Sequence, residues 1–308
     1  MAFPPLSLTP PSLLPWQLSY NGLTVGAATP WAVTGIQGLD LATIRSADIG
    51  RPRDHGEFVG LDVFGGRDVT VNLWMVSDGV SLQDSQVALA AATLVGLTTE
   101  QPLWFQLPNL PLMAVMCRTR KRTMAFDINY GAAQVGVPAL ALHATDPRIY
   151  GPTEEVSVGL PVLSGQFVFM ATPPFSFGGV VPIGSGVDNT GNFEGRPVLV
   201  ITGPVTNPSI SNASIVGNPT LTFSNPMASG FTVASGDQLV VDLDTHSVLY
   251  YVGGVASGSA PADRRFWLVM GSTWWNLPPG ANNINFQSSD GGATGASCQI
   301  IFAPAYQL

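Results

Sequence analysis

Short apolar runs closed by turn residues recur along the whole chain and limit the folds it can adopt. The 34 glycines and 26 prolines are spread through the 308 residues and do not gather in one low-complexity tract. Between them lie β-branched runs such as PVLVITGP at 197–204 and DQLVVDLD at 237–244. Runs of this length bounded by Gly, Pro or Asn are typical of strands joined by turns. The sequence therefore predicts a mostly β protein.

The candidate strands divide into two sets. In the first half we expect strands at 18–20, 32–36, 59–64, 68–75, 103–107, 112–120, 123–130 and 136–144. In the second half we expect them at 156–163, 166–171, 197–202, 209–211, 220–223, 238–242, 247–252, 265–270, 283–286 and 299–303. Segment 68–75 (DVTVNLWM) alternates, which predicts one apolar face made of Val69, Val71, Leu73 and Met75.

One segment, residues 81–97 (SLQDSQVALAAATLVGL), departs from the β pattern. Ser81 is followed by Asp84 three residues later, which is close to a capping box at a helix start. The apolar residues that recur at helical spacing are Val87, Ala90, Ala91, Leu94 and Val95. We expect a single amphipathic helix whose apolar stripe lies on a sheet or barrel.

The chain is long enough for two domains of ordinary size. Residues 143–153 (HATDPRIYGPT) contain Pro147 and Pro152, and strand periodicity stops there. We therefore expect a first domain at residues 1–153, which contains the helix, and a second at 154–308. The many short strands of the second domain favour a β-sandwich of jelly-roll or galectin-like type.

The chain carries few charges for its apolar content. Charged residues make up 10% and hydrophobic residues 45%, against about 25% charged residues in a typical soluble protein. No run approaches the roughly 20 apolar residues that span a bilayer as a helix, and the first residues do not resemble a secretory signal. We expect no membrane insertion. Burial against other protein chains is the leading explanation, because subunit interfaces are depleted in charge.

The balance of charge argues against nucleic acid as a partner. The formal net charge is −8, so a polyanion would be repelled. The cations that cluster are Arg118, Arg120, Lys121 and Arg122. In a regular strand the three arginines would share one face and Lys121 the other, and we expect a solvated strand or a subunit contact there.

Two cysteines and one Asp/His cluster are the candidates for metal or redox chemistry. Cys117 and Cys298 lie 181 residues apart without a Cys-x-x-Cys pair, so two reduced, buried thiols are favoured, as in a protein folded in a bacterial cytoplasm. Asp242, Asp244 and His246 alternate and would share a strand face, but a solvated face is favoured over a zinc site. We expect no metal and no cofactor.

A charged segment at 51–57 (RPRDHGE) is the best candidate for acid–base chemistry. Pro52 and Gly56 make it a loop, and loops between strands often carry such residues. We favour an inter-subunit contact through Arg51, Arg53, Asp54 and Glu57. No nucleophile elbow, phosphate-binding loop or dinucleotide fingerprint is present. A wall-degrading glycosidase with paired carboxylates stays open as the weakest alternative.

An ordered set of short motifs carries a family resemblance. The set comprises residues 189–191, 197–201 followed by Gly203-Pro204, Asn207-Pro208, Gly236-Asp237 before 240–242, and Ser272, Trp274 and 277–280 (LPPG) before Phe286. Together with Asp146-Pro147-Arg148, this set resembles the siphophage distal tail protein family. The motifs are specific in the second half, and the architecture extends the resemblance to the whole chain.

The resemblance implies a structural virion protein at the phage tail tip. It implies a hexameric ring formed by a barrel-like N-terminal domain with one helix, from which a C-terminal sandwich projects. The implied partners are further copies of the chain, the tail tube, tail-tip or hub proteins, and a receptor-binding protein. Such a protein is not an enzyme, and assembly would take place in the host bacterial cytoplasm.

A carbohydrate-binding module is the alternative from another functional class. Galectin-like sandwiches are a common lectin scaffold, and a fold does not decide a function. Aromatic rings that could stack on a host-surface glycan are those of Trp267, Trp274 and Trp275. If the segment is extended, Trp274 and Trp275 point to opposite faces, so we expect one in the core and the other exposed.

Overall fold

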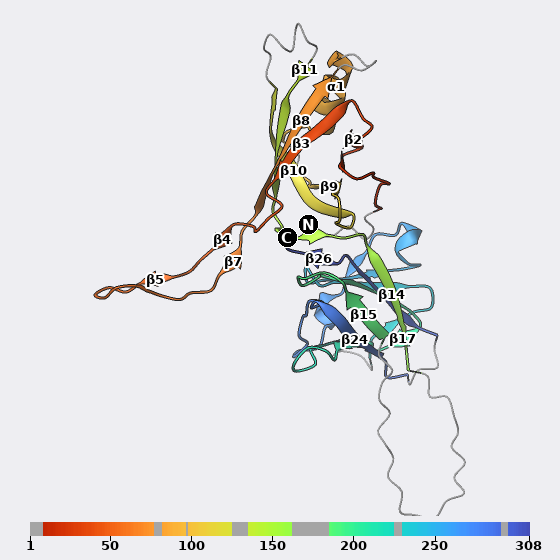
Figure 1. The fold of residues 1–308 in the computed structure, drawn as a ribbon. Coiled ribbons are helices and arrows are strands. Elements are labelled where there is room, and N and C mark those ends of the chain that lie inside the picture. The colour runs from red at the N-terminus through yellow and green to blue at the C-terminus, as the bar shows by residue number, and fades with distance from the viewer. Residues whose placement is uncertain are drawn as a thin grey trace, which may run out of the picture. The chain divides into compact units, whose positions relative to one another are not determined.

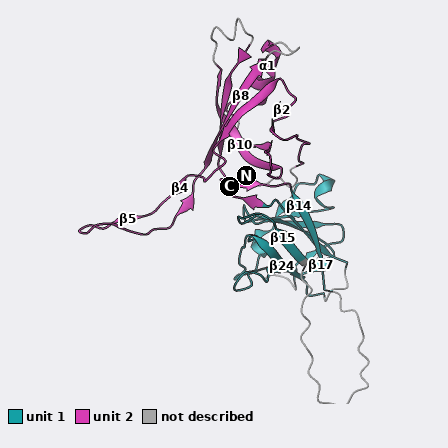
Figure 2. Ribbon diagram, viewed as in Figure 1, with its two compact units in different colours: residues 1–8, 153–304 teal, residues 9–152, 305–308 magenta. Residues whose placement is uncertain are grey.

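The protein is mostly β, as the sequence predicts. A computed structural model describes residues 9–76, 82–96, 98–124, 135–161, 185–224, 230–290 and 295–308. Within these ranges α1 (Leu82–Ala92) is the α-helix, and no helix is long and apolar enough to cross a membrane. The chain forms two compact units (Figure 2): unit 2 holds residues 9–152 and 305–308, and unit 1 holds residues 153–304.

Unit 2 is built on a 10-stranded sheet. Its central order is β11-β8-β12-β10-β9-β1-β2, with β3 paired to β8 and β13 paired to both β10 and β26. The strands are β1 (Gln17–Tyr20), β2 (Leu23–Gly26), β3 (Trp31–Gln37), β8 (Arg67–Val76), β9 (Gln101–Gln106), β10 (Met113–Met124), β11 (Val135–Gly136), β12 (Pro138–Ala144), β13 (Ile149–Tyr150) and β26 (Ala305–Tyr306). Residues 305–306, which we expect in the second domain, therefore pair within unit 2.

The sheet of unit 2 surrounds one hydrophobic core. β8 alternates as predicted, because Val69, Val71, Leu73 and Met75 are all buried. They share a core cluster with side chains from the far end of the sheet, such as Leu18 of β1. A sheet whose distant strands meet in one cluster must be strongly curved, which agrees with the expected barrel-like domain.

The helix forms where predicted, but with a different face toward the core. The residues of α1 that are buried are Leu82, Ser85, Leu89 and Ala92. The predicted stripe faces outward instead, with Val87 62% and Leu94 54% exposed. Both stripes have helical spacing, and the alanine-rich sequence offers no polar face to separate them. Ser81, the expected cap, lies outside the described residues.

Between β3 and β8 the chain leaves the sheet as a two-stranded arm, residues 43–65 (Figure 1). Four short strands form it: β4 (Ile44–Arg45) pairs β7 (Val63–Phe64), and β5 (Ile49–Gly50) pairs β6 (Glu57–Phe58). The strand expected at 59–64 is therefore present only at 63–64. Residues 59–62 form no regular strand, because the segment between β6 and β7 is one residue longer than the opposite segment between β4 and β5.

Unit 1 is a sandwich of two antiparallel sheets. One has the order β14-β25-β16-β21-β22-β23 and the other β15-β24-β18-β19, while β17 and β20 form a separate pair. The strands are β14 (Glu154–Gly159), β15 (Ser185–Asn189), β16 (Val198–Thr202), β17 (Val205–Thr206), β18 (Ser209–Asn212), β19 (Thr220–Thr222), β20 (Thr232–Val233), β21 (Gln238–Asp242), β22 (Ser247–Tyr251), β23 (Ala262–Asp263), β24 (Gly280–Gln287) and β25 (Ser297–Phe302). The two sheets share one core, to which Leu199 and Phe286 both contribute.

Local geometry sets one turn of unit 1 and overturns one expected strand. Gly280 has φ +84° at the start of β24, a conformation that glycine adopts without strain. The strand expected at 265–270 is wrong, because the 3₁₀ helix η2 (Arg265–Trp267) begins there. The Asp263 side chain accepts a hydrogen bond from the Arg265 N–H at 2.9 Å and favours a turn over an extended strand. A second 3₁₀ helix, η1 (Val255–Ser257), precedes β23.

Three further expectations are settled or fall outside the described ranges. The two strands expected at 112–120 and 123–130 are one strand, β10, as far as residue 124. Residues 125–130 and the strand expected at 166–171 lie outside the described residues. Cys117 and Cys298 are free and buried, as predicted.

Replacing Leu73 with alanine tests the core of unit 2. Leu73 is fully buried in the central strand β8, so Leu73→Ala removes apolar contacts and leaves a cavity. We expect the free energy of unfolding of unit 2, measured by urea denaturation, to fall by about 2–5 kcal/mol. Asn72→Ala, next along the strand on the other face, serves as the matched control. Equal stability of the two variants would contradict this description of the core.

Candidate assembly surfaces

The charged residues expected to make a subunit contact lie at the tip of the arm. Arg51, Arg53, Asp54 and Glu57 are all exposed there. Arg51 forms an ion pair with Asp54 at 3.8 Å, and its guanidinium lies 5.0 Å from the centre of the Phe58 ring. The structure therefore groups these residues at the farthest point from the sheet, with Arg51 ordering the turn.

The arm also exposes apolar side chains that the sequence analysis did not single out. Val59 is 95% and Leu61 75% exposed. The full set of exposed apolar residues in the arm is Ile44, Ile49, Phe58, Val59, Leu61 and Val63. An isolated two-stranded ribbon is at best marginally stable in water, and an exposed apolar patch of this kind usually marks an interaction site.

A contact in the middle of the arm holds its two strands together. The Gly60 N–H donates to the Asp48 carboxylate at 2.7 Å. This bond lowers the pKa of Asp48, and the Ser46 side chain acts in the same direction. A Cβ atom at Gly60 would lie 2.2 Å from the backbone of Ala47, so only glycine allows this approach. The extra residue between β6 and β7 is accommodated here.

The base of the arm is fixed by Arg67, whose side chain is only 2% exposed. Its Nε donates to the Pro147 carbonyl at 3.0 Å, and its Nη1 donates to the carbonyls of Gly38, at 2.9 Å, and Asp40. Burial lowers the pKa of the guanidinium, while the charge of Asp40 acts in the opposite direction. Arg67 therefore joins the segment that enters the arm, the strand that leaves it and the loop that contains Pro147, called the 147 loop below.

The basic residues of β10 do not share one face as predicted. The register of β10 on β12 shifts between Thr119 and Lys121, so Arg120 is an extra residue in a bulge. Arg122 then lies opposite the buried Leu140 and donates to the Thr93 side chain at 3.0 Å. The expected grouping of Arg118, Arg120 and Arg122 on one face is wrong, because the bulge reverses the alternation.

The three tryptophans proposed for sugar stacking have neighbours on their rings. Trp275 is 5% exposed and belongs to the core of unit 1, so it is the inward-facing member of the Trp274-Trp275 pair. Trp274 stacks on His246 with 4.5 Å between ring centres. Trp267 lies 4.2 Å from the Phe231 ring and carries the Arg264 guanidinium at 4.5 Å. These packing contacts do not favour a stacking platform.

A hydrogen-bonded pair lies in the same region as Trp267. The Tyr250 O–H donates to the Asp237 carboxylate, and the Gly253 N–H donates to its other oxygen at 2.8 Å. Both bonds lower the pKa of Asp237, the tyrosine first. The Arg264 guanidinium lies over the rings of both Tyr250 and Trp267.

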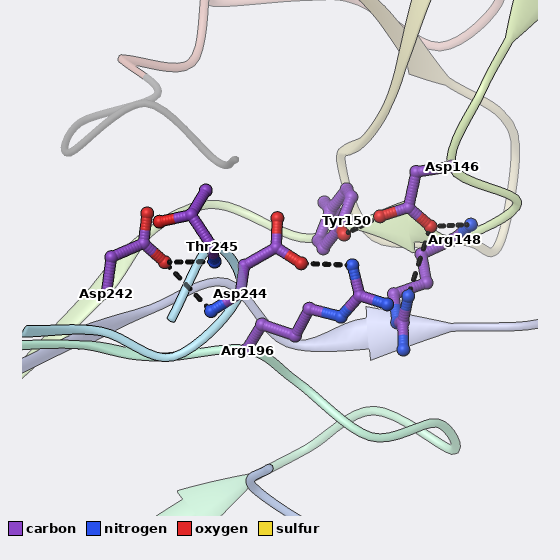
Figure 3. Close-up of polar contacts among 7 residues, drawn as sticks. All are labelled: Asp146, Arg148, Tyr150, Arg196, Asp242, Asp244 and Thr245. Carbon is purple, nitrogen blue, oxygen red and sulfur yellow. Dashed lines mark hydrogen bonds and ion pairs between the residues drawn. The ribbon is translucent and has the colours of Figure 1, made fainter. Parts of the chain in front are cut away.

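The Asp242, Asp244 and His246 cluster is a turn and not a strand face. β21 ends at Asp242, whose carboxylate accepts the N–H groups of Asp244 at 2.8 Å and Thr245 at 3.2 Å (Figure 3). Asp244 pairs with Arg196. His246 adopts φ +54°. The expected alternation fails because the side-chain bond of Asp242 ends the strand, and the described residues hold no cluster of three or more metal-binding side chains.

The Asp146-Pro147-Arg148 motif builds a local turn in unit 2. The Asp146 carboxylate accepts the Arg148 N–H at 3.0 Å and its guanidinium at 3.2 Å, and also the Tyr150 O–H at 2.6 Å (Figure 3). Arg148 and Tyr150 are buried. The motif therefore shapes the same 147 loop whose carbonyl binds Arg67.

Arg67 is the residue that sequence reasoning missed. It directly precedes the alternating strand and follows Gly65-Gly66, and a cation at the start of a buried strand is the signal that could have found it. The apolar set of the arm was missed because apolar residues in a strand pattern are usually assigned to a core.

Replacing Arg67 tests whether the arm depends on this side chain. Arg67→Met has a similar length but leaves the carbonyls of Gly38 and Pro147 without their donor. We expect a loss of about 3 kcal/mol in the free energy of unfolding of unit 2 and faster proteolysis within residues 43–65. Arg53→Met at the exposed tip should change stability by less than about 0.5 kcal/mol. Equal stability and equal proteolysis of the two variants would contradict the assigned role.

Replacing Tyr250 tests the hydrogen bond to Asp237. The pKa of Asp237 is lowered in the folded state, so the pair stabilises the protein above the unfolded value of about 3.9. This contribution is lost as pH falls through the lower folded value. Tyr250→Phe should raise the titration midpoint of the Asp237 carboxyl, measured by NMR, toward about 3.9. Tyr251→Phe should leave the midpoint in place, and an unchanged midpoint in Tyr250→Phe would refute the assignment.

Comparisons with known proteins place the fold. No family model matches the sequence, and no curated protein matches it. The crystal structure of Dit (gp 19.1) from phage SPP1, described as a paradigm of the hub adsorption apparatus in phages that infect Gram-positive bacteria, matches with a TM-score of 0.62 and 15% identity. The match covers 94% of this chain and 98% of the SPP1 chain.

Two structures of the phage P2 baseplate in its activated conformation, one with Ca and one with Sr, match with TM-scores of 0.48 and 0.47. Their identities are 11% and 9%, and the matches cover 92% of this chain and 97% and 96% of the baseplate chains. The resemblance to siphophage distal tail proteins that the sequence indicates is confirmed at the level of the fold: over 94% of its length the chain has the fold of SPP1 Dit.

Proposed function

We propose that this protein is a structural component of a siphophage tail tip, where a ring of six copies joins the tail tube to the host-recognition apparatus. The observation that carries this proposal is the fold shared with SPP1 Dit across nearly the whole chain. The protein would act in the virion by shape and apolar complementarity, without a cofactor. Tail-tube and tail-tip or hub proteins are its proposed partners beside its own copies.

The arm supports assembly with further copies of the chain. Six apolar side chains on residues 43–65 are exposed to solvent, and burying one such side chain contributes about 1.5–3 kcal/mol. The free energy gained by burying all six is comparable with the roughly 4–15 kcal/mol that association costs in lost translational and rotational freedom. One arm contact alone is therefore weak, whereas a closed ring gives every copy two contacts.

The two units would have different roles. Unit 2, which carries the arm, would form the ring, with Arg51, Arg53, Asp54 and Glu57 at the contact. Unit 1 would present a docking surface for a receptor-binding protein, since Phe266 and Met270 are exposed on it. A glycan-binding role has less support, because Trp275 is buried and the rings of Trp267 and Trp274 already contact protein groups.

Removing the apolar surface of the arm tests the proposal. We expect the purified wild-type protein to elute at about six chain masses by light scattering and to show rings in negative-stain images. Phe58→Asp, Val59→Asp and Leu61→Asp combined should elute as a monomer, because three exposed apolar contacts become charges. These residues are exposed in the single chain, so its folding should persist.

Val216→Asp provides the matched control, since Val216 is fully exposed on unit 1. It should assemble like the wild type. A wild-type protein that stays monomeric at high concentration would contradict the proposed ring. A triple variant that assembles normally would show that the arm is not the contact.

A further inference from the structure

Unit 1 is inserted between two paired strands of unit 2. β13 (Ile149–Tyr150) precedes unit 1 in the sequence and β26 (Ala305–Tyr306) follows it, yet the two strands pair with each other. Ile149 lies opposite Tyr306, and Tyr150 lies opposite Ala305. β13 is joined in turn to β10, where Tyr150 pairs with Ala114. The sheet of unit 2 is therefore completed by residues that lie beyond unit 1 in the chain.

The pair formed by β13 and β26 is well buried. Ile149 and Ala305 are fully buried, and Tyr150 is only 1% exposed. Tyr306 packs against the core of unit 2, and among the described residues it is the one side chain after residue 149 that does so. Without β26 the backbone of β13 would lose its partner on this side, and buried backbone groups without a partner are costly. The completed sheet therefore depends on this pair.

The two units have separate hydrophobic cores. The described core residues of unit 1 all lie between 156 and 302, whereas those of unit 2 lie between 18 and 149, apart from Tyr306. Both sheets of the unit 1 sandwich are formed by strands within residues 154–302. Unit 1 can therefore fold without a strand from unit 2. Unit 2, in contrast, cannot pair the outer side of β13 until residues 305 and 306 are present.

Synthesis from the amino terminus separates β13 from β26 in time. Residues 151–304 lie between them, and at roughly 5–20 residues per second these take about 8–30 s to make. We propose that β26 acts as a completion lock: unit 2 reaches its stable, assembly-competent form only after unit 1 has been synthesised. Incomplete copies, which lack the unit proposed to dock a receptor-binding protein, are thereby kept out of the ring. This consequence rests on the proposed function, whereas the lock itself does not.

Hydrogen exchange of full-length variants, followed by mass spectrometry, tests the lock. Ala305→Glu places a charge at a fully buried position of β26, so it should open the pair with β13. Leu308→Glu adds the same charge three residues further on, at an exposed position, and is the matched control. We expect amides of β1, β9 and β10 to exchange at least tenfold faster in Ala305→Glu, while those of β16, β21 and β25 keep their wild-type rates. Leu308→Glu should exchange like the wild type throughout.

Tyr306→Ala provides a milder variant in case Ala305→Glu leaves unit 2 wholly unfolded. It removes the ring that packs against the core of unit 2 and should speed the same exchange to a smaller extent. Wild-type exchange of unit 2 in both variants would overturn the inference. Faster exchange in both units alike would also overturn it, because the two units would then unfold together.

Co-expression tests whether chains with an open lock are kept out of the assembly. Affinity-tagged Ala305→Glu chains are produced together with untagged wild-type chains, and tagged Leu308→Glu chains serve as the control. We expect tagged Leu308→Glu to co-purify untagged chains, and tagged Ala305→Glu to recover less than a tenth as many. Equal recovery would overturn the exclusion of incomplete copies. A monomeric wild type would instead reject the proposed function, while the exchange rates would still decide whether the lock exists.

Discussion

The arm depends on the hydrogen bonds that the guanidinium of Arg67 donates. One buried side chain binds carbonyls of Gly38, Asp40 and Pro147, and so connects the entry to the arm, the strand that leaves it and the loop before unit 1. Three carbonyl groups replace water at Nε and Nη1 of this buried cation, while Nη2 is buried without a hydrogen-bond partner among the described residues. Gly38 permits the contact, since a Cβ atom there would lie 1.9 Å from the Asp68 carbonyl oxygen. The arm is thus set at its root by unit 2.

Part of the apolar surplus of the sequence is exposed on unit 2. A chain with 10% charged residues buries its alternating strands as expected, but it also exposes six apolar side chains on the arm and Val87 on α1. On the arm these apolar side chains adjoin charged ones, among them Arg51, Asp54 and Glu57. An exposed apolar patch rimmed by polar residues is typical of an interaction site, which favours the arm as a contact between copies.

Sequence patterns predicted what depends on local periodicity. β8 was found because its alternation reflects burial, β21 because it is a short apolar run bounded by turn residues, and α1 because its spacing is helical. The face of α1 was wrong, since two apolar stripes satisfy the same period. The register shift at Thr119–Lys121 and the 3₁₀ turn at Arg265–Trp267 depend on cross-strand pairing and on a side-chain bond from Asp263. Arg67 was missed because its three acceptors are distant in sequence.

An electron cryo-microscopy map of the assembled wild-type protein would show directly where the arm lies. We expect a closed ring in which residues 43–65 of each copy lie against the neighbouring copy. The side chains of Phe58, Val59 and Leu61 should be buried between copies. A closed ring in which the arm remains in solvent would contradict this assembly.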